Sequence, residues 1–129
     1  MAPKPIVLVL DDDAAVRTTM ERLLRAYGYD AVSAGTLEEA RALLGSTPLE
    51  ALILDVGLQA GQSGLDLLAT IRARSEFQKA PILIFTGGLL SEGQEATIRR
   101  HRAFLFHKPE GFDTLVKFLD TLTGRDRPH

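Results

Sequence analysis

The chain has 129 residues, of which 45% are hydrophobic and 25% charged, with a formal net charge of −2 and no cysteine. These values fit one domain over residues 1–129, with a core at about 5–122 and a polar tail at 123–129. They exclude disulfides and give no reason to expect direct contact with nucleic acid or a membrane surface.

Strand and helix patterns alternate five times along the chain. Short apolar runs predict strands at residues 6–10, 30–34, 51–54, 81–85 and 103–107. Amphipathic patterns predict helices at residues 14–27, from 37 to a stop at Gly45, at 65–74, from 91 to about 101, and at 112–122. This order predicts an α/β domain with a doubly wound, five-stranded parallel sheet and helices on both faces. The apolar runs are far shorter than the roughly 20 residues of a membrane-spanning helix, and the first strand begins too early for a signal peptide, so we expect a cytoplasmic protein.

Polar side chains follow the apolar runs of four predicted strands. Asp11 and Asp12 follow the first strand, Asp55 the third, Thr86 the fourth and Lys108 the fifth. Because the carboxyl ends of parallel strands form one edge where ligands bind, we expect these residues to meet there. Three carboxylates, a hydroxyl and an ammonium group predict a phosphoryl and divalent-metal site.

The acidic residues are candidate metal ligands. Adjacent carboxylates repel each other by about 1 kcal/mol or more near a surface, and a hard cation such as Mg²⁺ relieves that repulsion. We predict Asp12 and Asp55 as direct ligands, Asp11 as a ligand through water, and the backbone carbonyl of Gly57 as a further ligand. The alternative is that the acidic triplet only caps the first helix, a role we assign to Asp13.

The other polar residues also have two interpretations each. Asp55 is a candidate nucleophile that accepts a phosphoryl group, or a residue that caps a turn. The Thr86 hydroxyl could donate to a phosphoryl oxygen, or could start a turn with Gly87. Lys108 could bridge Asp55 and a phosphoryl oxygen, or could be a solvated lysine. Together the residues favour one coherent site.

The segments IVLVLDDDAAVR, ALILDVGL, SGLDLL, PILIFTGG and FHKP resemble those of receiver domains of two-component response regulators, over about residues 5–122. The resemblance implies a flavodoxin-like strand order 2-1-3-4-5. It implies a single receiver domain in which Asp55 accepts phosphoryl from a sensor histidine kinase or a phosphotransfer protein. Mg²⁺, or Mn²⁺, would be held by Asp11, Asp12, Asp55 and the Gly57 carbonyl, while Thr86 and Lys108 would contact the phosphoryl group.

The resemblance also bears on activity and partners. It implies a signalling domain and not an enzyme, with at most self-phosphorylation and slow autodephosphorylation. The expected partners are a kinase, a downstream protein or output domain, and a second copy of the chain. Phosphorylation would switch the surface of the fourth helix, fifth strand and fifth helix, where residues 99–102 form a basic cluster that could also be a solvated helix end.

Three regions depart from the family pattern. One is the segment after Lys108 and Pro109, where Glu110 and Gly111 stand in place of a common aromatic residue, a role that Phe112 could fill after a shifted turn. After Asp55, Gln59 stands where a proline is usual and Gly64 comes one residue late, which predicts a longer and more flexible loop. Leu105 occupies the position of an aromatic switch residue and is flanked by Phe104 and Phe106. Either a neighbouring phenylalanine substitutes, or signalling does not use that rotation.

Three other functions compete with this one. Asp11 and Asp13 form an Asp-x-Asp pattern like that of haloacid-dehalogenase-like phosphatases, but only the isolated Asp113 and Asp120 follow where that family needs an acidic pair. A degenerate receiver would be a protein-binding module that is never phosphorylated. A flavodoxin-like FMN binder is disfavoured because an acidic first loop would repel the cofactor phosphate.

Overall fold

Five parallel strands form one sheet in the order β2-β1-β3-β4-β5. The computed structural model describes residues 3–107 and 111–123. The strands are β1 Ile6–Leu10, β2 Asp30–Ala34, β3 Ala51–Asp55, β4 Ile82–Thr86 and β5 Phe104–His107. The helices are α1 Ala14–Ala26, α2 Leu37–Ser46, α3 Leu68–Ala73, α4 Glu92–Arg100 and α5 Phe112–Leu122, with 3₁₀ turns at Gln59–Gly61, Gly64–Leu67 and Ser75–Phe77. The predicted fold class and strand order are confirmed.

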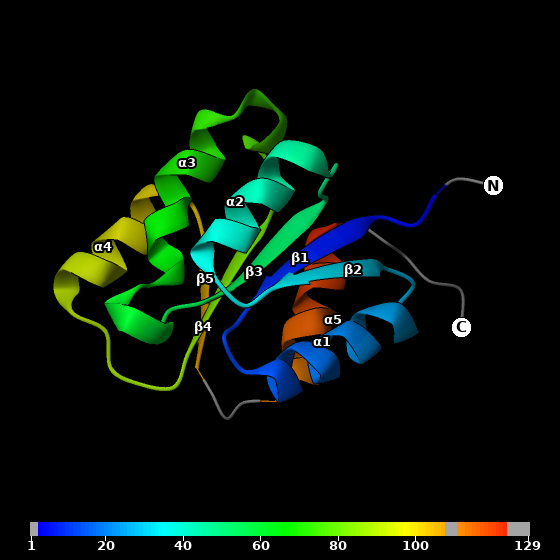
Figure 1. Ribbon diagram of the computed structural model, residues 1–129, viewed down its shortest axis with the longest axis horizontal. Coiled ribbons are helices and arrows are strands. Elements are labelled where there is room, and N and C mark those ends of the chain that lie inside the picture. Colours follow the sequence, from blue (N-terminus) through cyan, green and yellow to red (C-terminus); the bar gives the residue numbers. More distant parts are fainter. Residues whose placement is uncertain (1–2, 108–110, 124–129) are drawn as a thin grey trace.

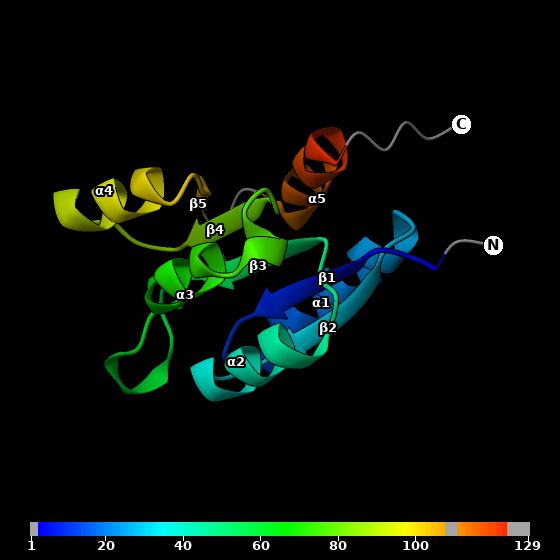
Figure 2. The same ribbon diagram turned by 90° about the horizontal axis from the view of Figure 1, so that it is seen from above.

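The helices cover both faces of the sheet, with α1 and α5 on one side and α2, α3 and α4 on the other (Figures 1 and 2). A hydrophobic core lies on each face of the sheet, and alternate strand residues pack into one core or the other. Val7 and Val9 pack toward α1 and α5, whereas Leu8 and Leu10 pack toward α2 and α3. Burial on both faces explains why the strands are continuous apolar runs. Within the described part of the chain, no helix is long and apolar enough to cross a membrane.

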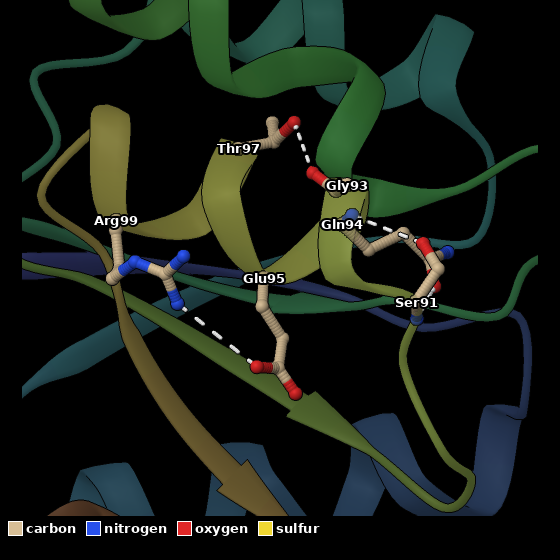
Figure 3. Close-up of polar contacts among 6 residues, drawn as sticks. All are labelled: Ser91, Gly93, Gln94, Glu95, Thr97 and Arg99. Atoms are coloured by element: carbon tan, nitrogen blue, oxygen red, sulfur yellow. Dashed lines mark hydrogen bonds and ion pairs between the residues drawn. The ribbon is translucent and has the colours of Figure 1, made fainter.

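Capping residues define several helix ends. The Asp13 carboxylate accepts hydrogen bonds from the backbone N–H groups of Ala15 and Val16, at 2.8 and 3.4 Å, and so begins α1. Gly28 follows α1 with φ = +91°, in the left-handed region where glycine is favoured. At α4, Ser91 and Gln94 form the expected reciprocal capping box, part of which is drawn in Figure 3.

Three predicted helix limits were wrong. The expected helix at 65–74 is divided into the 3₁₀ turn Gly64–Leu67 and the helix α3. Helix α2 continues past Gly45 and ends at Ser46. The next residue, Thr47, has an extended backbone, because it precedes Pro48 and a residue before proline is biased away from helical geometry. The first helix ends at Ala26 rather than Tyr27.

Gly64 lies against the end of β3. A Cβ atom there would stand 2.3 Å from the Asp55 carbonyl oxygen and 3.1 Å from the Leu54 Cβ. We expect Gly64→Ala to lower the free energy of unfolding by about 1–3 kcal/mol, because the β3 backbone would have to shift. Urea denaturation measures this change. Gly57→Ala is the matched control, since a Cβ there meets nothing within 4 Å, and equal effects of the two substitutions would contradict the packing argument.

The guanidinium of Arg72 joins the connection before β4 to the connection before β5. It donates hydrogen bonds at 2.7 to 3.3 Å to the backbone carbonyls of Phe77, Gln78, Ala80, His101 and Arg102. Desolvation by burial and the nearby charge of Arg102 both lower the pKa of Arg72. This one side chain therefore ties two loops that are distant in sequence.

Arg72→Met should destabilise the fold by about 2–3 kcal/mol, because several carbonyls lose a charged donor while the apolar part of the side chain is kept. The midpoint of urea unfolding reports the effect. Arg22→Met, at an exposed position of α1, should shift the midpoint little. A loss no larger than that of the control would mean that water replaces Arg72 at these carbonyls without cost.

Candidate functional site

The sheet register brings the predicted carboxylates together. Leu10 of β1 pairs with Leu54 of β3, so Asp11 and Asp55 follow at the same level of the sheet. Asp11, Asp12 and Asp55 each offer one carboxylate oxygen, and these oxygens lie within 4.8 Å of one another. Such a set of hard oxygen donors fits Mg²⁺, which needs one or two carboxylates together with other oxygens.

Two of the three carboxylates are buried. Asp11 is 1% exposed and Asp55 is 5% exposed, whereas Asp12 is half-buried. Asp11 Oδ1 accepts a hydrogen bond from the Asp13 N–H at 2.9 Å, and Asp55 Oδ1 accepts one from the Gly57 N–H at 3.2 Å. Burial of charge costs free energy unless it is compensated, so this cluster of carboxylates favours the binding of a positive charge.

The backbone of Gly57, two residues after Asp55, is exposed to solvent. No atom lies within 4 Å of the place where its Cβ would be. The backbone next to the acidic cluster is therefore accessible. The predicted ligation through the Gly57 carbonyl stays a prediction.

Thr86 ends β4 at the same edge of the sheet. Its neighbour Phe85 pairs with Asp55, and Thr86 is only 5% exposed. The hydroxyl accepts a hydrogen bond from the Gly88 N–H at 3.2 Å. Thr86 thus begins the predicted turn and also lies at the edge that carries the acidic cluster. To donate to a ligand, its hydroxyl would have to point its hydrogen into the site.

Lys108 lies outside the described residues. Strand β5 ends at His107, which pairs with Thr86. The predicted contact of Lys108 with Asp55 stays a prediction.

The Asp-x-Asp alternative is not supported by the arrangement of the acidic residues. Asp13 is exposed, and its carboxylate caps α1. On α5, Asp113 accepts a hydrogen bond from the Tyr27 hydroxyl and Asp120 accepts one from the Tyr29 hydroxyl, each at 3.0 Å. The hydrogen bonds from Lys117 and Tyr27 lower the pKa of Asp113. Each of these carboxylates is engaged in a contact between α5 and the turn that connects α1 to β2.

The two phenylalanines beside Leu105 lie on the opposite side of the sheet from it. Successive strand residues face opposite sides, and Leu105 packs toward the core of α2, α3 and α4, the side to which Thr86 belongs. Phe104 and Phe106 instead pack edge-on against Phe118 of α5, with ring centroids 5.1 and 5.2 Å apart. Of the two options for the switch, the one in which a neighbouring phenylalanine substitutes is therefore disfavoured.

The long loop after Asp55 folds back on itself. Leu58 N–H donates to the Gln62 carbonyl at 3.0 Å, and Ala60 and Gly61 adopt positive φ angles of 59° and 71° between them. These two residues therefore form a tight left-handed turn within the loop. The expected gain in flexibility stays a prediction.

The basic cluster at the end of α4 has local partners. Arg99 lies 3.9 Å from Glu95 one turn earlier, as Figure 3 shows, and Arg102 donates to the Gln78 carbonyl at 3.2 Å. His101 Nδ1 lies 2.8 Å from the Thr97 carbonyl. These contacts favour the interpretation of this cluster as a helix end with local pairing.

Sequence reasoning missed one residue next to the site. Arg17 Nη1 donates a 2.6 Å hydrogen bond to the backbone carbonyl of Asp11. The only signal was the arginine at the end of the segment IVLVLDDDAAVR, one helical turn after the cap Asp13, and that signal alone does not show the contact.

Known proteins resemble this chain over nearly its whole length. The model of the response regulator receiver domain matches residues 7–120. Transcriptional regulatory protein AruR of Pseudomonas aeruginosa is 39% identical over 92 residues, 67% of this chain; the chain spans only 36% of that protein. A response regulator receiver protein from Pseudomonas putida is 30% identical with a TM-score of 0.79, covering 98% of this chain and 100% of its own. A response regulator protein from Burkholderia pseudomallei, solved with a phosphorylated aspartic acid, calcium ion and citrate, is 27% identical with a TM-score of 0.77, covering 94% of this chain and 69% of its own.

Proposed function

Because this chain belongs to the response regulator receiver domain family, we propose that Asp55 accepts a phosphoryl group from a sensor histidine kinase or a phosphotransfer protein. The observation that carries the proposal is the convergence of carboxylate oxygens from Asp11, Asp12 and Asp55 within 4.8 Å. Asp55 ends the buried central strand β3, and its Oδ1 accepts a hydrogen bond from the Gly57 N–H. Support also comes from the Burkholderia pseudomallei relative, whose structure contains a phosphorylated aspartic acid and a calcium ion.

In the proposed reaction a carboxylate oxygen of Asp55 attacks the phosphorus of a phosphohistidine. The new O–P bond forms as the N–P bond breaks. The electron pair of that bond goes to the imidazole, which leaves as a neutral ring because its other nitrogen already carries a proton. The product on this chain is an aspartyl phosphate. Most of the catalysis in such a transfer is positioning and neutralisation of charge.

The surrounding residues would supply these two effects. Asp12 and Asp55 would bind Mg²⁺ or Mn²⁺ directly, with Asp11 acting through water and the Gly57 carbonyl as a further ligand. The bound cation neutralises charge on the carboxylates and on the phosphoryl oxygens. The Thr86 hydroxyl, which accepts a hydrogen bond from the Gly88 N–H, would donate its hydrogen to one phosphoryl oxygen, and Lys108 would neutralise another.

The phosphorylated chain would then act through a change of surface. Phosphorylation adds roughly 1.5 to 2 negative charges at a site that touches the ends of β1, β3 and β4. We propose that the surface of α4, β5 and α5 responds and that it binds a downstream protein, an output domain or a second copy of the chain. The domain over residues 1–129 would act in the cytoplasm as a signalling module. Slow autodephosphorylation, in which water hydrolyses the aspartyl phosphate and inorganic phosphate leaves, would return Asp55 to its free carboxylate.

Intact mass spectrometry tests the proposal. The chain is incubated with acetyl phosphate and Mg²⁺, in which case acetate leaves instead of imidazole. The expected result is a labile gain of one phosphoryl group. A folded chain that gains nothing would favour a protein-binding module that is never phosphorylated. Turnover of phosphate monoesters would instead favour a phosphatase.

A further inference from the structure

Arg17 reaches back from α1 to the loop that carries two of the acidic residues. Its side chain is half-buried, and Nη1 donates to the backbone carbonyl oxygen of Asp11 at 2.6 Å. Gly35, in the turn after β2, leaves the space for this guanidinium: a Cβ at position 35 would stand 3.0 Å from Nη1. The contact therefore depends on two neighbouring loops, not on the helix alone.

This hydrogen bond holds the peptide unit between two candidate metal ligands. A peptide group is planar, so the Asp11 carbonyl oxygen and the Asp12 Cα belong to one rigid unit. The other side of Asp11 is also fixed, because its N–H donates to the Ala34 carbonyl at 3.1 Å and its Oδ1 accepts from Asp13 N–H. Arg17 thus restricts rotation of the unit from which the half-buried Asp12 side chain extends.

We propose that Arg17 is a positioning residue that orients the Asp11–Asp12 peptide and thereby sets the affinity of the acidic cluster for a divalent cation. The inference rests on the proposed function, since it concerns the same cation site. Two effects of Arg17 oppose each other. Its positive charge near the cluster weakens cation binding, whereas its hydrogen bond strengthens binding by holding Asp12 in place. The short hydrogen bond to the ligand backbone favours the second effect, and residues behind metal ligands commonly change affinity by about 10–100-fold.

Whether the affinity for Mg²⁺ falls or rises when Arg17 is replaced shows which effect dominates, the hydrogen bond or the repulsive charge. In a Mg²⁺ titration followed by amide NMR shifts of Asp12 and Gly57, Arg17→Met should weaken binding by about tenfold. Removal of a merely repulsive charge would instead leave binding unchanged or make it tighter, and that result overturns the proposal. Arg17→Lys, which keeps the charge and one donor group, should bind Mg²⁺ with an affinity between those of wild type and Arg17→Met.

Gly35→Ala tests the same idea without any change of charge. The new Cβ would stand 3.0 Å from Nη1 and would push the guanidinium by a few tenths of an ångström. We therefore expect a smaller loss of affinity for Mg²⁺ than in Arg17→Met, and a tighter affinity contradicts the proposal. The Gly35→Ala variant also tests the proposal if Arg17→Met does not fold. Arg22→Met, on the same helix and exposed, is the control for loss of a cation. Urea unfolding with a chelator present shows whether each variant is stable before Mg²⁺ is added.

The wild-type titration distinguishes failure of this inference from failure of the proposed function. If wild type shows no saturable Mg²⁺ binding and no gain of phosphoryl mass, the proposed function fails and the role of Arg17 fails with it. If wild type binds Mg²⁺ and is phosphorylated while Arg17→Met and Gly35→Ala bind Mg²⁺ equally well, only the role of Arg17 is overturned.

Discussion

Asp55→Asn should abolish the gain of phosphoryl mass that the wild-type chain shows with acetyl phosphate and Mg²⁺. The amide keeps the shape of the carboxylate, and its oxygen can still accept the hydrogen bond from Gly57 N–H. It lacks the negative charge that makes the carboxylate a nucleophile and a ligand for the cation. We therefore expect no detectable phosphorylated species in a folded variant, as measured by intact mass.

Two controls make this result specific to Asp55. Circular dichroism and urea unfolding of the variant should show a folded domain. Asp13→Asn removes a carboxylate from the same end of the sheet but from a residue that caps α1, so it should still be phosphorylated. If Asp55→Asn gains the full phosphoryl mass, the acceptor lies elsewhere in the chain, and peptide mapping of the phosphorylated protein would locate it.

Removal of divalent cations should slow phosphorylation of the wild-type chain by at least about 100-fold. Carboxylate oxygens from Asp11, Asp12 and Asp55 lie within 4.8 Å of one another, and the phosphoryl donor is itself an anion. Without a cation the donor would have to approach a concentrated negative charge. The time course of mass gain, measured with a chelator and then with excess Mg²⁺ or Mn²⁺, gives the ratio of rates.

The same experiment on Asp12→Asn identifies the ligand. Asp12 is the half-buried member of the cluster, and its loss should raise the Mg²⁺ concentration needed for half-maximal rate. Phosphorylation at an unchanged rate in the chelator would show that the acidic cluster does not act through a cation. An unchanged Mg²⁺ requirement in Asp12→Asn would remove Asp12 from the ligand set.

Much of the architecture could be predicted from local patterns. Strands buried on both faces, such as β1 and β3, are continuous apolar runs, and the helices between them carry apolar residues at helical spacing. The strand order could not be predicted in this way, because local patterns do not show which strands are neighbours. The order was inferred from the resemblance to the family, and the structure confirms it. Helix limits were less reliable where a 3₁₀ turn replaced the start of a helix, as at Gly64–Leu67.

The candidate site could be predicted because a parallel sheet gathers the carboxyl ends of its strands. Asp55 is far in sequence from the adjacent pair Asp11 and Asp12, yet the three carboxylates meet for this geometric reason. Thr86 was expected at the same edge and lies there. Lys108 is outside the described residues, and its role depends on the experiments with phosphorylated protein.

The sequence by itself thus determined the α/β class, the edge of the sheet that carries the acidic residues, and the identity of those residues, because each follows from a local pattern and from the common direction of parallel strands. Only the tertiary structure decided the contacts between segments whose proximity no sequence pattern predicts. It placed Gly64 against the Asp55 carbonyl, the Arg17 guanidinium on the Asp11 carbonyl, and Phe104 and Phe106 on the side of the sheet opposite Leu105. The physical reason is that these contacts depend on the distances between loops and on the packing of each face of the edge strand β5 against a particular helix.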